Sequence, residues 1–209
     1  MSSISLPRLA NLGLPNWITL GRLVLALVLF VVLSLPVDGR YTAGFVIFLL
    51  AVGSDWIDGY VARRFGLTSS LGRVLDPFVD KILICGTLVF LVAEPVFRHR
   101  AELLQPWMVV LVILRELLVT AMRGWAEERG QDFSAQLAGK TKMVIQSVAC
   151  AAGLLFVAWH TKSGETPFWL GLTLATSVWL MVVVTVYSAW VYAVKAAVAE
   201  TGRERAAQN

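Results

Sequence analysis

The sequence predicts an all-α integral membrane protein with six transmembrane helices in a single domain, residues 1–209. Hydrophobic residues make up 57% of the chain and charged residues only 15%, whereas soluble domains carry about a quarter charged residues. The mean hydropathy is +0.72, and several apolar runs approach the roughly 20 residues that a helix needs to cross a bilayer. The sequence shows no internal repeat and no sign of a second domain.

Six apolar runs account for the six helices. The expected spans are 17–35, 41–63, 75–97, 105–127, 138–160 and 167–195. Pro36 and Gly39 end the first span, and Pro106 stands at the entry of the fourth. The sixth span is long, so we expect it to be tilted or interrupted, and the tail 200–209 to be frayed and soluble. Residues 1–16 fit a short N-terminal helix on the membrane surface or a disordered leader equally well, and they do not indicate a removable signal peptide.

The distribution of basic residues predicts the orientation. When loops are assigned alternately, only Arg40, Arg98, Arg100 and Lys162 of the 18 basic residues fall near one side. The others share a side with both termini, and basic residues gather on the cytoplasmic side of membrane proteins. We therefore expect a multi-pass protein of the cell inner (plasma) membrane with both termini in the cytoplasm. The net charge of +4 suits anionic lipid, and no nucleic-acid partner is expected.

Four carboxylates interrupt the second and third apolar runs. Asp55 and Asp58 are three residues apart, and Asp76 and Asp80 are four apart, so each pair shares one helix face. The stretch 64–73 is typical of a turn between antiparallel helices, which would bring both pairs to a similar depth on the cytoplasmic side. Each carboxylate costs about 2.5–3.5 kcal/mol or more at membrane depth, and oxygen ligands suit hard divalent ions. This arrangement predicts a cation site.

A second polar group follows in the fourth and fifth spans. Arg115 and Arg123 are eight residues apart, close to two helical turns, so they can share a face with Glu116 as a pairing partner. Together with Lys140 and Lys142 they could bind an anionic phosphate, and carboxylate-held metals beside such cations suit phosphoryl-type transfer. The simpler alternatives are a structural Arg115–Glu116 ion pair and interfacial anchoring by the two lysines.

The spacing of these residues matches a family signature. The pattern Asp55-x-x-Asp58-Gly59-x-x-Ala62-Arg63-x8-Gly72-x-x-x-Asp76-x-x-x-Asp80 resembles the complete signature of the CDP-alcohol phosphotransferases. The segments LPNWITLGR, RELLVTAMRGWAEERG and LAGKTKMVIQ also resemble those of the bacterial CDP-diacylglycerol–glycerol-3-phosphate 3-phosphatidyltransferases (phosphatidylglycerophosphate synthases). The resemblance covers roughly residues 11–190.

This resemblance implies a role for each candidate residue. Two Mg²⁺ or Mn²⁺ ions would be bound by Asp55, Asp58, Asp76 and Asp80, and Asp80 would also serve as the general base. CDP-diacylglycerol would be contacted by Asn16, Thr19, Arg22, Asp58, Gly59, Ala62, Arg63, Ser69, Gly72 and Arg73. The phosphate of the acceptor would be held by Arg115, Arg123, Lys140 and Lys142.

The resemblance also implies a reaction in phospholipid biosynthesis. The phosphatidyl group of CDP-diacylglycerol would pass to sn-glycerol 3-phosphate, giving phosphatidylglycerophosphate and CMP, and the enzyme would be a homodimer by analogy with the family. The same chemistry with inositol phosphate, serine or phosphatidylglycerol as acceptor is an alternative. Another is a divalent-cation transporter that uses the aspartates as an ion pathway, although the broken helices and repeats typical of transporters are not evident.

Overall fold

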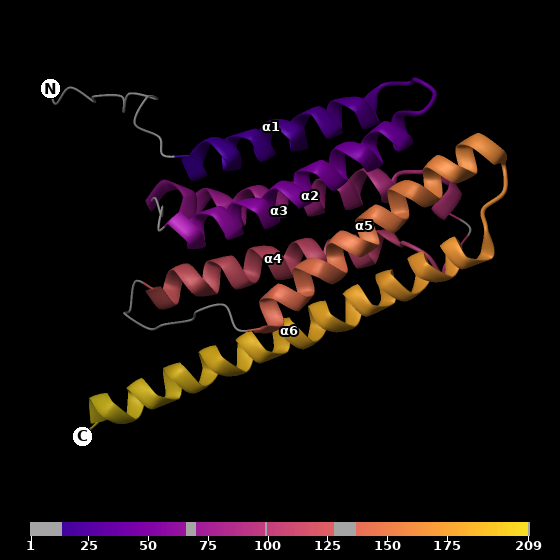
Figure 1. The fold of residues 1–209 in the computed structure, drawn as a ribbon. Coiled ribbons are helices and arrows are strands. Elements are labelled where there is room, and N and C mark those ends of the chain that lie inside the picture. Colours follow the sequence, from indigo (N-terminus) through magenta and orange to yellow (C-terminus); the bar gives the residue numbers. More distant parts are fainter. Residues whose placement is uncertain (1–13, 66–69, 99, 128–136, 209) are drawn as a thin grey trace, which may run out of the picture. The chain divides into compact units, whose positions relative to one another are not determined.

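The structure, a computed structural model, describes residues 14–65, 70–98, 100–127 and 137–208, and side chains within 19–54, 75–98, 100–126 and 141–195. These residues form six α-helices and one short 3-10 helix, and no strand occurs among them. The elements are α1 (Leu14–Ser34), α2 (Arg40–Phe65), α3 (Ser70–Val92), η2 (Pro95–Phe97), α4 (Pro106–Glu127), α5 (Leu137–Ser163) and α6 (Phe168–Gln208) (Figure 1). The predicted all-α class is confirmed for this part of the chain.

The chain divides into two compact units, residues 1–86 (unit 1) and 87–209 (unit 2). In unit 1, α1 packs along α2 (Figure 1). Gly86 on α3 faces the ring of Phe30 on α1, and a Cβ atom at Gly86 would lie 2.1 Å from Phe30 Cζ. Glycine therefore permits the close approach of these two helices. The expected single domain stays a prediction.

In unit 2, α4 and α5 both pack against α6 (Figure 1). Phe156 of α5 is fully buried and stacks on Phe97 of η2, with ring centroids 5.9 Å apart. The turn from α5 to α6 passes through Gly164, whose φ of +72° lies in the left-handed region that glycine adopts without steric cost. Its amide donates to the carbonyl of His160 at 2.9 Å, which closes the last turn of α5.

Three of the expected helix ends are wrong. The third span was expected to begin at residue 75 after a turn over 64–73, but α2 runs to Phe65 and α3 already begins at Ser70. The third span was expected to reach residue 97, but α3 ends at Val92 and Pro95–Phe97 forms the separate turn η2. Proline lacks an amide hydrogen and disfavours helical conformation in the residue before it, so the α-helix does not continue through Pro95. The expected frayed tail is also wrong, because α6 runs unbroken to Gln208. The residues after 199 are rich in Ala, Arg and Glu, which are strong helix formers.

Within the described residues, two stretches are long and apolar enough to cross a membrane, Thr141–Ser163 and Phe168–Lys195. Two shorter apolar helical stretches, Thr19–Ser34 and Arg40–Ser54, lie in unit 1. Large apolar side chains stand exposed on α6, among them Val183 at 60% and Trp190 at 70%. Exposed apolar side chains in such numbers favour contact with lipid. The full set of six spanning helices stays a prediction.

Candidate active site

The four aspartates lie at matched depths on two consecutive helices. Asp55 and Asp58 belong to α2, Asp76 and Asp80 belong to α3, and only residues 66–69 separate the two helices. Such a short connection makes consecutive helices antiparallel neighbours. Asp55 and Asp80 each lie about 15 Å from the facing helix ends at a rise of about 1.5 Å per residue, and Asp58 and Asp76 lie about 10 Å from them.

Two residues of α1 hold the carboxylates of α3. Thr19 Oγ1 donates to Asp76 Oδ1, and Arg22 Nη1 donates to Asp80 Oδ1 at 2.8 Å. Thr19 and Arg22 are three residues apart and only 2% and 1% exposed, so both point from one face of α1 into the interior of unit 1. The sequence predicts these two residues in the nucleotide pocket. The structure shows that they bind the aspartates.

The two aspartates of α3 fit a divalent cation. Their carboxylates lie one helical turn apart, and the Asp80 side chain is 19% exposed. They supply four oxygens, two of which accept the bonds from α1, and hard cations bind carboxylate oxygens. Among the described side chains no group of three or more His, Cys, Asp or Glu residues forms a metal site. The side chains of Asp55 and Asp58 lie outside that part of the structure.

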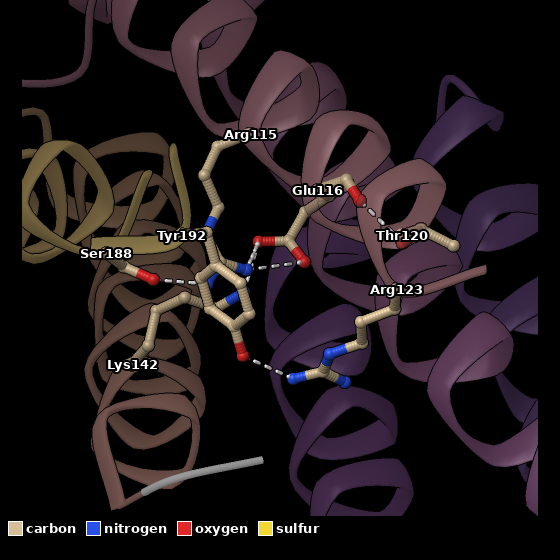
Figure 2. Close-up of polar contacts among 7 residues, drawn as sticks. All are labelled: Arg115, Glu116, Thr120, Arg123, Lys142, Ser188 and Tyr192. Carbon is tan, nitrogen blue, oxygen red and sulfur yellow. Dashed lines mark hydrogen bonds and ion pairs between the residues drawn. The ribbon is translucent and has the colours of Figure 1, made fainter. Parts of the chain in front are cut away.

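Unit 2 contains a second polar group, which we call the cation cluster: Arg115, Glu116 and Arg123 of α4, Lys142 of α5, and Ser188 and Tyr192 of α6 (Figure 2). Glu116 accepts from Arg115 Nη1 at 3.3 and 3.4 Å, and it also accepts from Lys142 Nζ. The expectation that Glu116 pairs with a neighbouring cation is confirmed, and its carboxylate joins two of them.

Helix α6 completes the cation cluster. Arg115 Nη2 donates to Ser188 Oγ, and Arg123 Nη2 donates to the hydroxyl of Tyr192 at 2.7 Å (Figure 2). The guanidinium carbons of both arginines lie 5.6 Å from the centroid of the Tyr192 ring, which confirms that they share a face of α4. The sequence-based prediction missed Ser188 and Tyr192. Their four-residue spacing on one face of a largely apolar helix was the available signal.

The cation cluster carries a surplus of positive charge and is buried except at Arg123, which is half-buried. Arg115, Glu116 and Lys142 are 6%, 7% and 4% exposed, and the described members of the cluster comprise three cations and one carboxylate. Three cations beside one carboxylate give these described side chains a net positive charge, so the cluster suits an anionic ligand. A phosphate monoester carries about −1.5 to −2 at neutral pH. The burial of Lys142 argues against a solvent-exposed interfacial anchor.

The remaining site predictions concern residues whose side chains the structure does not describe. They are Asn16, Asp55, Asp58, Gly59, Ala62, Arg63, Ser69, Gly72, Arg73 and Lys140. Their roles stay predictions.

A helical, apolar chain with paired carboxylates and a buried cation cluster has the features of a membrane-associated enzyme that acts on phosphate groups. A sequence model described as CDP-alcohol phosphatidyltransferase matches residues 12–190. The chain belongs to the CDP-alcohol phosphatidyltransferase family of enzymes. This family generally uses divalent metal ions.

Individual relatives are similar over most of their length. A CDP-diacylglycerol–glycerol-3-phosphate 3-phosphatidyltransferase of Bacillus subtilis (strain 168) is 34% identical over 192 residues, which cover 86% of this chain and 93% of the relative. The enzyme of the same name from Sodalis glossinidius (strain morsitans) is 32% identical over 145 residues, which cover 66% of this chain and 75% of the relative. The CDP-diacylglycerol–glycerol-3-phosphate 3-phosphatidyltransferase 2 of Arabidopsis thaliana is 35% identical over 188 residues, which cover 81% of this chain and 77% of the relative.

Proposed function

We propose that this enzyme transfers the phosphatidyl group of CDP-diacylglycerol to sn-glycerol 3-phosphate, giving phosphatidylglycerophosphate and CMP. The names of the similar enzymes support this choice of substrates. The observation that carries it is the cation cluster, whose charge surplus matches the phosphate monoester of the acceptor. Serine has no phosphate to occupy such a cluster, which favours a phosphorylated acceptor.

In this proposal, Arg115, Arg123 and Lys142 hold the acceptor phosphate, together with Lys140. Guanidinium groups match the oxygens of a phosphate with paired N–H donors. Glu116 positions Arg115 and Lys142 through its carboxylate. The acceptor is thereby held by its charged end, which leaves its hydroxyl for reaction.

Unit 1 supplies the donor-binding residues in the same proposal. Two Mg²⁺ or Mn²⁺ ions are held by Asp55, Asp58, Asp76 and Asp80, and when bound they neutralise charge on the diphosphate of CDP-diacylglycerol. Thr19 and Arg22 orient two of these carboxylates from α1. The proposed contacts to the CDP group come from Asn16, Thr19, Arg22, Asp58, Gly59, Ala62, Arg63, Ser69, Gly72 and Arg73.

Asp80 is the proposed general base. Its carboxylate takes the proton from the 1-hydroxyl of glycerol 3-phosphate as that oxygen attacks the phosphorus that carries diacylglycerol. The new P–O bond replaces the bond from that phosphorus to the CMP oxygen, and CMP leaves with the electron pair. The ion pair with Arg22 supports this assignment, because it keeps the carboxylate oriented.

The proposed setting is a multi-pass protein of the cell inner membrane. All six α-helices would span the bilayer, with both termini and the reacting groups on the cytoplasmic side, and two copies would form a homodimer. The apolar stretches of α5 and α6 and the asymmetric distribution of basic residues support this arrangement. A lipid donor would then enter from the bilayer and a soluble acceptor from the cytoplasm.

The test is a CMP-release assay on purified protein with CDP-diacylglycerol and Mg²⁺. Glycerol 3-phosphate is compared with inositol phosphate, serine and phosphatidylglycerol as acceptors. We expect CMP release with glycerol 3-phosphate and at least about tenfold less with each of the others. Release that depends on another acceptor would overturn the substrate assignment. A cation transporter would release no CMP with any acceptor.

A further inference from the structure

A groove of about 570 Å³ opens in unit 2, far from the cation cluster. Its lining comprises Arg100, Glu102 and Leu103 before α4, residues 164–167 in the turn after α5, and Phe168, Gly171, Leu172 and Ala175 of α6. Phe168 and Ser188 lie about 30 Å apart along α6, at a rise of about 1.5 Å per residue. That length matches the hydrocarbon thickness of a bilayer, so the groove and the cluster would face opposite membrane surfaces.

The part of the groove on α6 is one apolar helix face. Phe168, Gly171, Leu172 and Ala175 recur at intervals of three and four residues. Gly171 and Ala175 are small and leave a furrow, whereas Phe168 is 85% and Leu172 52% exposed. The furrow therefore presents an apolar surface about two helical turns long, against which the apolar part of a ligand can pack.

The other end of the groove is charged. Arg100 supplies the cation of the lining, and Glu102 and Glu165 supply two carboxylates. The guanidinium of Arg100 lies 5.6 Å from the centroid of the buried Phe156 ring, and its backbone carbonyl accepts a bond from Gln105 Nε2 at 2.9 Å. Arg100 is thus held at the mouth of the groove by contacts on both its side chain and its backbone.

Aromatic residues mark this end of unit 2 as a membrane boundary. The rings of Trp107 and Trp179 lie 6.1 Å apart, both are about half exposed, and Trp179 Nε1 donates to the carbonyl of Glu102 at 3.1 Å. Tryptophans with a polar edge and an apolar body gather at the level of lipid headgroups. The charged end of the groove would lie at that level, with the apolar furrow running into the bilayer.

We propose that the groove binds a phospholipid with a zwitterionic headgroup of the phosphoethanolamine type. The phosphate pairs with Arg100, the ammonium group with Glu102 and Glu165, and one acyl chain lies along the furrow of Gly171 and Ala175. A headgroup with phosphate alone would place no positive charge beside the two carboxylates. The proposal rests on the proposed membrane insertion of unit 2 and is independent of the phosphatidyl transfer.

Lipid binding can be measured by native mass spectrometry of the purified protein in detergent. The probes are dioleoyl phosphatidylethanolamine and dioleoyl phosphatidylglycerol, titrated separately. We expect the ethanolamine lipid to bind at least about fivefold more tightly. Arg100→Ala should weaken its binding about tenfold, because it removes a charged hydrogen-bond donor to the phosphate. Arg98→Ala is the matched control, since Arg98 is exposed and lies outside the lining.

A second variant tests the furrow without altering any charge. Ala175→Leu fills it with a good helix former at a half-buried position and should weaken ethanolamine-lipid binding to a similar extent. Equal binding of the two lipids overturns the proposal, as does equal binding by Arg100→Ala and Arg98→Ala, or unchanged binding by Ala175→Leu. CMP release by the same preparations should be unaltered. A preparation that releases CMP and fails the lipid test overturns this inference alone.

Discussion

Arg22 of α1 and Asp80 of α3 form an ion pair at 2.8 Å, 58 positions apart in the chain. The Arg22 side chain is 1% exposed and the Asp80 side chain is 19% exposed, so the pair lies largely within unit 1. Removing one partner of a buried pair is more damaging than replacing both, because it leaves a charge without its counter-ion. The pair thus links the stability of unit 1 to the residue that we propose as the base.

The first prediction concerns this pair. Arg22→Met should destabilise the protein by up to about 3–5 kcal/mol, because the charge of Asp80 loses this partner. Thermal unfolding in detergent measures the effect as a Tm lowered by several degrees. The double variant Arg22→Met with Asp80→Asn should recover part of the loss. Strictly additive effects of the two changes would contradict the coupling.

The second prediction concerns the chemistry of Asp80. Asp80→Asn keeps the size of the side chain and an acceptor for Arg22 but cannot take the proton of the acceptor hydroxyl. CMP release should fall at least about 100-fold, which is the lower end of a general base's contribution, while the protein stays folded. Asp38→Asn is the control, since Asp38 is exposed in the connection between α1 and α2. Substantial residual activity in Asp80→Asn would remove Asp80 as the base.

The third prediction concerns the acceptor phosphate. Arg123→Ala and Lys140→Ala should each raise the KM for glycerol 3-phosphate about tenfold to 100-fold, because each removes a charged donor to the phosphate. The KM for CDP-diacylglycerol should change far less. Lys162→Ala is the control, since Lys162 is an exposed cation at the other end of α5. If neither variant alters the acceptor dependence, the phosphate assignment is wrong.

The fourth prediction uses the charge balance of the cation cluster. Glu116→Gln keeps the shape of the side chain but leaves three cations without this carboxylate, so the Tm should fall. Millimolar glycerol 3-phosphate should raise the Tm of this variant by more than it raises the Tm of the unaltered protein, because the phosphate then supplies the missing negative charge. Glycerol at the same concentration is the control ligand. Equal Tm shifts in both proteins would contradict the role given to Glu116.

The fifth prediction compares two buried hydroxyls on α6. Thr185 Oγ1 has no hydrogen-bond partner among the described residues, whereas Ser188 Oγ accepts a bond from Arg115. Thr185→Val should therefore be neutral or stabilising, since it removes an unpaired polar atom. Ser188→Ala should cost about 1–3 kcal/mol, because it leaves an arginine donor unpaired. Thermal unfolding of the two variants decides this, and a larger loss for Thr185→Val would contradict it.

The helices were largely predictable because their signals are local. Apolar runs predicted all six α-helices. The errors lie at helix ends, whose positions depend on a single residue, as at Pro95, or on the helix propensity of a few residues, as in the tail of α6. The shared helix face of Asp76 and Asp80, and that of Arg115 and Arg123, also followed from spacing alone.

The partners of those residues could not be predicted in the same way. Thr19 and Arg22 carried no local sign that they would bind Asp76 and Asp80. Ser188 lies 73 positions from Arg115, and no helical period relates them. Such pairs depend on which helices pack together and at which rotation.

The sequence by itself determined the helical, apolar character of the chain, the two charged groups and the family to which it belongs, since periodicity, composition and motif spacing are local properties. Only the tertiary structure decided that α1 anchors the aspartates of α3 and that Glu116 joins two cations. It also decided that α6 completes the cation cluster. The physical reason is that buried charges take the partners that packing brings within reach.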